Sequence, residues 1–305
     1  MSNEGLMSNE QEENGEFVRQ DDEFRGNIEP EDAEPGRYHL YVSLACPWAH
    51  RTLIMRKLLG LEDVISASVV DPIRDHIGWR FGEGEGFGPD PVNGFSYLSE
   101  AYFATNPAFP DRVTVPVLWD KEKKVIVNNS EDDICPIFQK SFAGPDAPDF
   151  FPSHLEKEQT ELSEFIYEKV NNGVYRAGFA TSQCAYENAV KVLFDALEVL
   201  ELRLGNNRYL LGDQIVETDW RLFCTLLRFD PVYVGHFKCN LKRIVDYPNL
   251  SGFLRELYQL PGIAETVNFD HIKRHYYVTH DDINPTQIVP VGPLMDLDAP
   301  HGRGE

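Results

Sequence analysis

The stretch 43-SLACPWAHR-51 joins a β-like run to a helix-like run and places a cysteine at the junction. Before it, residues 38–44 alternate apolar side chains with others, as a strand does. After it, apolar residues recur at a helical period over 47–59. A second β-like run follows at 64–70, so the stretch lies inside a βαβ unit, and the handedness of such units favours a parallel pair of strands.

The remainder of the first half predicts a long loop and then a hairpin. Residues 71–110 are rich in Gly, Pro and aromatic residues, and a loop of this length is usually functional or disordered. Its glycine run 82-GEGEGFG-88 does not fit a nucleotide loop, because two glutamates would face the phosphates and no Gly-Lys-Ser/Thr follows. Two short β runs, 113–120 and 124–129, predict an antiparallel hairpin, and a helix is expected over 130–138.

The second half of the chain predicts an all-α domain. Apolar residues recur at helical spacing in four segments: 153–171, 183–204, 218–229 and 248–260. We therefore expect four parts along the chain: a disordered acidic tail over 1–36, an α/β domain over 37–145, an all-α domain over 146–270, and an extended aromatic and proline-rich tail over 271–305.

The composition limits the classes of protein to which the chain can belong. Hydrophobic residues make up 42% and aromatic residues 12% of the 305 residues, which favours a globular protein. The net charge of −22 is spread along the chain, and such a surface repels nucleic acid and anionic membranes. No apolar run approaches the ~20 residues of a membrane span, and no signal-peptide pattern is present. We expect a soluble, cytoplasmic protein without nucleic-acid or membrane partners, whose acidity either keeps it dissolved or suits a salt-rich cytoplasm.

Cys46 stands out because it lies at the start of the predicted helix. Backbone N–H groups there lack intrahelical partners, and the helix dipole places partial positive charge on them. A thiolate is stabilised at that point, so its pKa falls below the usual ~8.5. No second cysteine follows three residues on, so an outside thiol would have to resolve any mixed disulfide. The local pattern favours a reactive cysteine over a buried structural one without deciding between them.

The other cysteines and one histidine pair predict no further site. Four cysteines lack a basic or capping context or lie among apolar residues, and we interpret them as inert: Cys135, Cys184, Cys224 and Cys239. No C-x-x-C motif suggests a disulfide framework or a zinc site. His271 and His275 have the i, i+4 spacing of zinc ligands, but no Glu follows the first His and no helix is expected there. We expect no metal.

Motifs spread over both halves resemble those of a known family. The first half, with 45-ACPWAHR-51 and 115-VPVLWD-120, resembles the thioredoxin-like half of glutathione transferases. The more specific motifs resemble those of the Xi class, the glutathionyl-hydroquinone reductases: 78-GWRF-81, 171-NNGVYRAGFATSQ-183, 236-HFKCNLKRIVDYPNL-250 and 272-IKRHYYVTHDDINPTQIVPVGP-293. The resemblance implies a thioredoxin-like thiol-binding domain followed by an all-α, glutathione-transferase-like domain.

The resemblance also implies the roles of individual residues. Cys46 would be the nucleophile, Tyr175 the proton donor, and Tyr233 and Tyr276 would line an aromatic substrate pocket. Trp79 would pack over the bound thiol.

The thiol would also meet backbone and polar groups of the first domain. The family's thiol peptide pairs with an extended segment as an added strand, which here would consist of Arg112, Val113, Thr114 and Val115, leading into Pro116. The Val115–Pro116 bond would be cis. Ser130 and Glu131 would hold the γ-glutamyl end.

The implied reaction is the removal of glutathione from a glutathionyl-hydroquinone. Cys46 thiolate attacks the thioether sulfur, Tyr175 protonates the departing aromatic, and a second thiol releases Cys46. Glutathione would be the co-substrate, an aromatic thioether or quinone the substrate, and the protein a homodimer. Two alternatives stay open: a general thiol transferase or dehydroascorbate-reductase-like enzyme, and a non-catalytic scaffold.

Two positions depart from the family pattern. The family reads Asn-Glu-Ser where this chain reads Asn129, Ser130, Glu131, which moves the carboxylate by about 100° around a helix. This leaves γ-glutamylcysteine or another small thiol as an alternative to glutathione. Val216 replaces a helix-capping Thr, which we expect to affect only the folding of the second domain.

Overall fold

A computed structural model describes residues 12–304 of the chain, which form two compact units. The first unit comprises Gln20–Pro148 and Thr266–Gln287. The second comprises Asp149–Glu265 together with residues 12–19 and 288–304. No helix among these residues has both the length and the apolar character needed to cross a bilayer.

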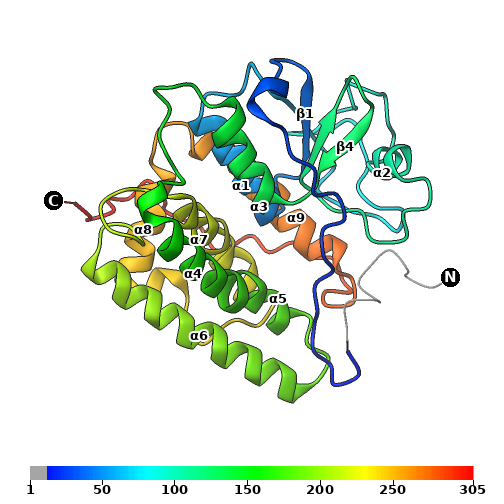
Figure 1. Cartoon of the computed structure of the whole chain (residues 1–305). Helices are drawn as coiled ribbons and strands as arrows, with labels where there is room; N and C mark the ends of the chain where they lie inside the picture. The colour runs from blue at the N-terminus through cyan, green and yellow to red at the C-terminus, as the bar shows by residue number, and fades with distance from the viewer. Residues whose placement is uncertain (1–11, 305) are drawn as a thin grey trace. The chain divides into compact units, whose positions relative to one another are not determined.

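The first unit is built on a four-stranded sheet in the order β2-β1-β3-β4 (Figure 1). The strands are β1 (Tyr38–Val42), β2 (Ser66–Val69), β3 (Val117–Asp120) and β4 (Val125–Asn128). β1 is parallel to β2 and antiparallel to β3, and β3 pairs with β4 in an antiparallel hairpin. The predicted parallel pair and the predicted hairpin are thus both confirmed. Every residue of β1 is buried, as expected for a central strand.

Four helices belong to the first unit: α1 (Pro47–Leu58), α2 (Ser99–Thr105), α3 (Glu131–Ile137) and α9 (Phe269–Thr279). α1 and α3 follow the predicted segments closely. α2 lies inside the stretch predicted to be a long loop, so that prediction is wrong over these seven residues.

The N-terminal segment is not a disordered tail where the structure describes it. Gly26 N–H donates to the Val127 carbonyl oxygen at 2.9 Å, and the Asn129 N–H donates to the carbonyl oxygen of Phe24 at 3.0 Å. Ile28 is buried. The segment therefore pairs with the edge of β4 and covers a strand that would otherwise expose its hydrogen-bonding groups. The prediction of disorder is wrong for 12–36, and its first eleven residues lie outside the described part of the chain.

α9 corrects the prediction of an extended tail that begins at residue 271. The Asn268 side chain caps the helix by accepting from the His271 N–H at 3.0 Å. Two histidines then attach α9 to the long loop of the first unit. His271 Nε2 lies 2.7 Å from the Glu85 carbonyl oxygen, and His275 Nδ1 lies 2.8 Å from that of Pro72. These long-range bonds hold a helix that its local sequence favours only weakly.

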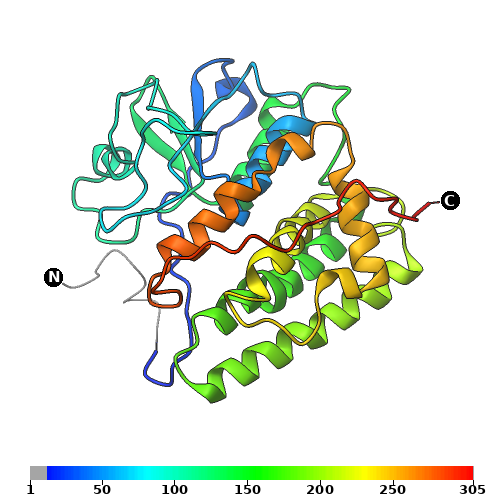
Figure 2. The ribbon, with the colours of Figure 1, turned by 180° about the vertical axis from the view of Figure 1, so that it is seen from behind.

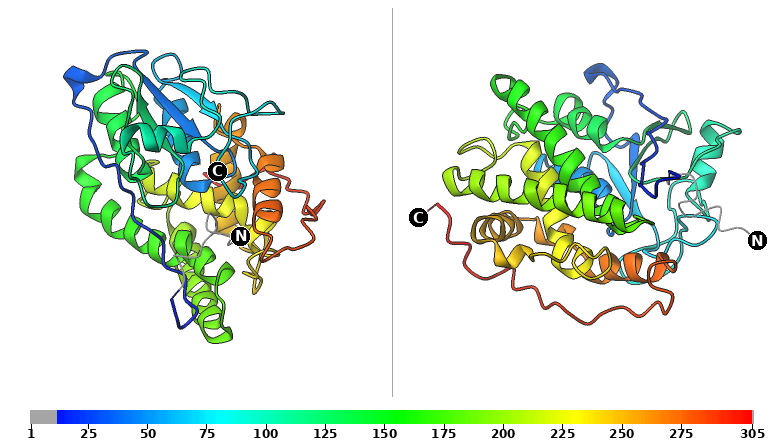
Figure 3. Two further views of the ribbon diagram at one scale, coloured as in Figure 1. Left: turned by 90° about the vertical axis from the view of Figure 1, so that its right-hand side faces the viewer. Right: turned by 90° about the horizontal axis from the view of Figure 1, so that it is seen from below.

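The second unit is all α, as predicted. Its helices are α4 (Glu156–Ile166), α5 (Asn172–Gly178), α6 (Gln183–Asn206), α7 (Glu217–Arg228) and α8 (Pro248–Tyr258). α6 packs against α5 and α8, and α4 packs against α7 (Figure 3). A π-helical turn at Tyr167–Asn171 joins α4 to α5, so the helix predicted to end at residue 171 continues through this turn into α5.

The start of α7 shows how the missing Thr at Val216 is tolerated. Val216 is the N-cap, and the Asp219 carboxylate accepts from the N–H groups of Val216 at 2.8 Å and Leu210 at 2.9 Å. Burial raises the pKa of Asp219 to about 7, although both N–H bonds favour its ionised form. One side chain therefore holds both the helix start and the preceding loop.

Residues 288–304 have no regular secondary structure and run along the second unit (Figure 2). Gln259 Nε2 donates to the carbonyl oxygens of Leu297 and Ala299, and Arg303 pairs with the buried Glu256 at 3.1 Å. The end of the chain is thus attached to α8 at two points.

Candidate active site

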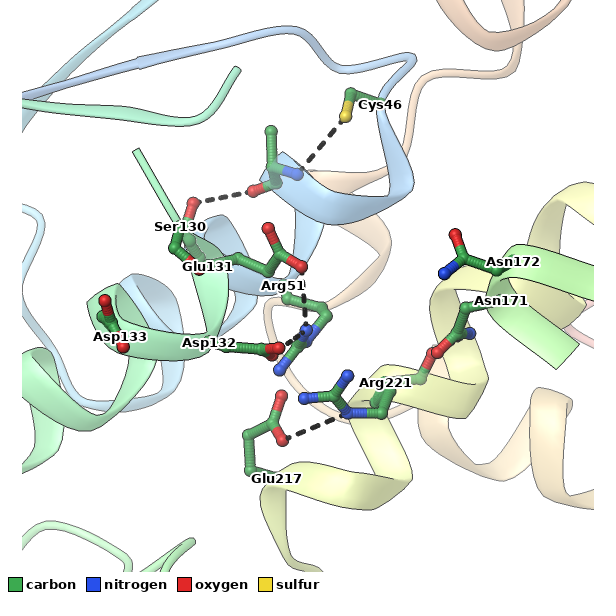
Figure 4. A network of polar contacts seen from close by, with 12 residues as sticks. Cys46, Arg51, Ser130, Glu131, Asp132, Asp133, Asn171, Asn172, Glu217 and Arg221 are labelled. Atoms are coloured by element: carbon green, nitrogen blue, oxygen red, sulfur yellow. Dashed lines mark hydrogen bonds and ion pairs between the residues drawn. The ribbon is translucent and has the colours of Figure 1, made fainter. Parts of the chain in front are cut away.

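Cys46 is the N-cap of α1. Its Sγ accepts a hydrogen bond from the Ala49 N–H at 3.5 Å (Figure 4). The same sulfur lies 3.6 Å from the carbonyl oxygen of Val115, to which the thiol donates. The side chain is half-buried. This is the position in which the first turn of a helix stabilises a thiolate, because its N–H groups and dipole both favour negative charge.

The other four cysteines differ from Cys46 in setting. None of the chain's five cysteines, all of which are described, is in a disulfide. Cys135, Cys224 and Cys239 are buried, and burial raises the pKa of the Cys239 thiol well above its usual range. Cys184 is exposed in the first turn of α6. Three of the four therefore fit the predicted inert role, and Cys184 offers a matched comparison for Cys46.

The segment before Pro116 approaches Cys46 through Val115. The Val115–Pro116 bond is cis, as the family resemblance implies. The Gln20 side chain donates to the Arg112 carbonyl oxygen at 2.9 Å and accepts from the Arg112 N–H at 3.3 Å. Gln20 thus makes the pair of bonds that an added strand would make to Arg112. Binding of a thiol peptide along this segment remains a prediction.

Thr114 is held in a similar way from α2. The Tyr102 hydroxyl donates to the Thr114 carbonyl oxygen at 2.9 Å and lies 3.2 Å from the Thr114 N–H. Val113, between the two held residues, is half-buried. The segment is thus fixed on either side of Val113 by side chains that come from two other elements.

Ser130 and Glu131 lie at the start of α3, and Glu131 faces a cation of α1. Ser130 is the N-cap and is almost fully buried. Arg51 Nη1 lies 3.3 Å from Glu131 Oε1 and 2.8 Å from Asp132 Oδ1 (Figure 4). Burial, and then the charge of Asp132, raise the pKa of Glu131 to about 7, against the opposing effect of Arg51. Burial therefore favours the neutral form of Glu131 below pH 7, and the ionised carboxylate pairs with Arg51.

Trp79 and Tyr276 both contact His275 in the first unit. Trp79 is buried and stacks on the His275 ring, with ring centroids 5.0 Å apart and planes 20° apart. Tyr276, the next residue of α9, is buried and meets the rings of His275 and His280 edge-on, with centroids 5.2 Å and 5.6 Å away. α9 thus fixes the orientation of the indole that is predicted to pack over the thiol.

Tyr175 and Tyr233 lie together in the second unit. Tyr175 belongs to α5, and Tyr233 ends the π-helical turn Phe229–Tyr233 that follows α7. Their ring centroids are 6.1 Å apart. Phe237 lies 5.4 Å from both rings, stacked on Tyr233 and edge-on to Tyr175. The structure thus brings the predicted proton donor and one pocket tyrosine into one aromatic cluster.

Two residues in these arrangements were missed by the sequence analysis. They are Gln20 and Arg51, whereas His275 was considered only as a metal ligand. Gln20 lies in the segment predicted to be a disordered tail, where Phe17 and Phe24, spaced among polar residues, were the available signal of docking. Arg51 lies in the quoted opening stretch, four residues after Pro47, but its carboxylate partners are 80 residues away and no local pattern indicates them.

Within residues 12–304, no cluster of three or more His, Cys, Asp or Glu side chains has the arrangement of a metal site. His271 and His275 do lie one turn apart on α9, but their ring nitrogens face the Glu85 and Pro72 carbonyl oxygens.

Comparisons with known proteins match both units. Residues 45–139 match the model of the glutathione S-transferase N-terminal domain, and residues 184–256 match that of the C-terminal domain. The chain is 56% identical to the glutathionyl-hydroquinone reductase YqjG of Escherichia coli, over 89% of this chain and 84% of YqjG. It is 48% identical to the glutathionyl-hydroquinone reductase PcpF of Sphingobium chlorophenolicum, over 93% and 91% of the two chains. The solved structure of YqjG with bound glutathione has a TM-score of 0.90, at 52% identity over 92% of this chain and 96% of that one.

The raised pKa of Glu131 gives a pH prediction. Its pKa is about 7 in the folded chain, against the ordinary 4.5. The stability that this group contributes is fully present below pH 4.5 and is lost as the pH rises through 7, because the folded state then binds more protons than the unfolded state. We expect the free energy of unfolding of the wild type to fall, relative to that of Glu131→Gln, by up to about 1.4 kcal/mol per pH unit between pH 5 and 7.

Urea unfolding of both proteins at each pH measures this difference. The comparison cancels the titration of other groups, such as Asp219, whose pKa is also raised. A difference that stays constant across this pH range would contradict the prediction.

Proposed function

Because the chain belongs to the glutathionyl-hydroquinone reductases, the Xi class of the glutathione S-transferase family, we propose that it removes glutathione from aromatic thioethers of the glutathionyl-hydroquinone type. The observation that carries the proposal is the position of Cys46 as the N-cap of α1, within reach of the Val115 carbonyl oxygen. Two relatives named as reductases of this kind align with nine-tenths of the chain.

The proposed reaction balances in two thiol-exchange steps. The Cys46 thiolate attacks the glutathionyl sulfur, so that a disulfide bond forms and the carbon–sulfur bond breaks. The electron pair of that bond passes to the aromatic carbon, and Tyr175 supplies the proton. A second glutathione then attacks the mixed disulfide, which releases glutathione disulfide and the Cys46 thiolate. The aromatic carbon is reduced by two electrons, and the thioether sulfur and the sulfur of one free glutathione are together oxidised to one disulfide.

The remaining predicted residues have proposed roles in binding. Trp79 packs over the thiol, and its fixed stacking on His275 supports this role because the indole is already oriented. Tyr233 and Tyr276 keep the substrate-contacting role that the family resemblance implies, because a phenol offers an aromatic substrate both an apolar ring and a polar hydroxyl. The segment Arg112–Val115 receives the peptide part of the thiol through Val113 and Val115, because the backbone groups of Arg112 and Thr114 are already bonded to the Gln20 and Tyr102 side chains.

Replacement of the nucleophile tests the proposed function. We expect Cys46→Ser to lose nearly all reduction of glutathionyl-menadione, because a serine hydroxyl is not ionised at neutral pH and cannot form the mixed disulfide. Far-ultraviolet circular dichroism should be unchanged. Cys184→Ser is the matched control, because that cysteine is also in the first turn of a helix, and it should keep full activity.

Two results would favour the alternatives, and a third would exclude Cys46 as the nucleophile. A higher kcat/KM for disulfides or dehydroascorbate than for the quinone adduct would indicate a general thiol transferase. Full turnover by Cys46→Ser would remove Cys46 from the reaction. An ordinary pKa for Cys46, together with no turnover of either kind of substrate by the wild type, would leave a non-catalytic scaffold.

The exchanged order of Ser130 and Glu131 bears on which thiol is used. We propose glutathione, since a relative at 52% identity is solved with glutathione bound. The Glu131 carboxylate is held by Arg51, which weakens its ability to bind the ammonium group of a γ-glutamyl thiol. Restoring the family order with the double variant Ser130→Glu, Glu131→Ser should therefore lower the KM for glutathione by about ten-fold, or about 1.4 kcal/mol.

Intact mass spectrometry identifies the thiol directly. After incubation with glutathione and γ-glutamylcysteine in competition, we expect the mixed disulfide on Cys46 to carry glutathione. An adduct with γ-glutamylcysteine alone would show that γ-glutamylcysteine, and not glutathione, is the thiol used. An unchanged KM in the double variant would show that the exchanged pair does not contact the γ-glutamyl group.

We also propose that the protein is a homodimer. Apolar side chains are exposed along α6, at Val192 (45%), Val199 (51%) and Leu202 (68%), and they share one face at helical spacing. Sedimentation velocity should give twice the mass of the chain at high ionic strength, where the repulsion between acidic surfaces is screened. The variant Leu202→Glu should sediment as a monomer, and a monomeric wild type would contradict the proposal.

A further inference from the structure

Arg19 lies over the ring of the predicted proton donor. Its guanidinium carbon is 4.6 Å from the centroid of the Tyr175 ring and 5.5 Å from that of Phe17. Both aromatic residues and Arg19 belong to the second unit. The cation is therefore placed at the face of a phenol, where the electrons of the ring attract it.

A side-chain hydrogen bond fixes the position of this cation. Arg19 Nε donates to Asn172 Oδ1 at 2.7 Å, and Asn172 is almost fully buried. Asn172 begins α5 and lies three residues before Tyr175, so both side chains are on the same face of the helix. The planar guanidinium can stack on a ring while Nε bonds to the amide, a combination that a lysine cannot reproduce.

The surroundings of Tyr175 strengthen the effect of a nearby charge. Phe17 and Phe179 stack against its ring, with centroids 6.4 Å and 6.1 Å away, and Phe237 meets it edge-on at 5.4 Å. Tyr175 is only 9% exposed. Charges interact more strongly in such an apolar setting than in water, because less solvent screens them.

We propose that Arg19 is a positioning residue that stabilises the phenolate of Tyr175 during proton donation. The inference rests on the proposed function, in which Tyr175 gives its proton to the aromatic carbon as the carbon–sulfur bond breaks. That donation leaves a negative phenolate in an apolar cluster, which is costly unless a cation is near. Part of the phenolate charge is delocalised into the ring over which Arg19 lies, so the cation interacts more strongly with the ring after the proton has left than before.

The kinetic test separates charge from bulk. In Arg19→Gln, kcat for glutathionyl-menadione should fall by about ten-fold while KM changes less than two-fold, because the cation acts on the transition state and not on substrate binding. The alkaline limb of the kcat profile should move to higher pH, since the phenol loses its proton less readily. Arg19→Lys should keep part of the activity and most of the pH profile, because it keeps the charge.

A double-mutant cycle tests whether Arg19 acts through Tyr175. In a Tyr175→Phe background, Arg19→Gln should cause no further loss, because no phenolate forms. The exchange of Cys46 with a small disulfide requires no proton transfer to carbon and should be unchanged in Arg19→Gln. Equal losses in both backgrounds, or an equal loss in disulfide exchange, would show a merely structural role and overturn the proposal.

One measurement is independent of the enzymatic reaction. The ultraviolet difference titration of tyrosinate, taken as wild type minus Tyr175→Phe, reports the ionisation of Tyr175 alone. Its midpoint should move to higher pH when Arg19 is replaced by Gln. If the midpoint does not move, the inference is overturned even if the enzyme is active. If the midpoint moves but the wild type shows no turnover, the proposed function is refuted, and the effect of Arg19 on Tyr175 still stands.

Discussion

The hydrogen bond from the Ala49 N–H to Cys46 Sγ is the interaction on which the proposed chemistry depends. The register of the sheet places Cys46 near Val115. Tyr41 of β1 pairs with Val117 of the antiparallel β3, so the residues just after β1 and just before β3 lie at the same end of the two strands. This brings the Val115 carbonyl oxygen within 3.6 Å of the sulfur. The protonated thiol can donate to that carbonyl, and the thiolate can accept from the helix N–H groups. The Cys46 side chain thus caps the start of α1 and also carries the reactive sulfur.

Although the chain is strongly acidic, it buries some of its few cationic side chains. The sequence has 50 acidic and 28 basic residues, yet Arg51 is buried between two carboxylates and Arg303 is nearly buried against Glu256. Removing such an arginine would leave a buried carboxylate without a counter-charge, which costs more than the intact pair contributes. These two arginines therefore serve as fixed internal attachments between elements.

The sequence predicted what local periodicity encodes and missed what distant contacts stabilise. The parallel pair, the hairpin and the helices α1, α6, α7 and α8 all have regular apolar spacing, and they were found. α9 is rich in His, Tyr, Val and Thr, which favour helices weakly, and it depends on bonds to Glu85 and Pro72, nearly 200 residues earlier. The segment 20–28 fails for the same reason: its strand-like pairing partner is β4, a hundred residues later. Among the candidate site residues, family motifs named Cys46, Trp79 and the tyrosines, but not the side chains that hold them in place.

The exchanged pair Ser130-Glu131 shows why such supporting residues matter for specificity. In the sequence, the exchange reads as a displaced carboxylate that could still serve a bound ammonium group. In the structure, that carboxylate meets Arg51, and Asp132 meets the same guanidinium. A cation from the thiol would have to compete with a buried arginine that is already in place, and the carboxylate is partly neutralised near pH 7 by its surroundings. The exchange therefore affects the charge at the start of α3 as well as the position of the carboxylate, because Arg51, about one turn after Cys46 on α1, pairs with Glu131.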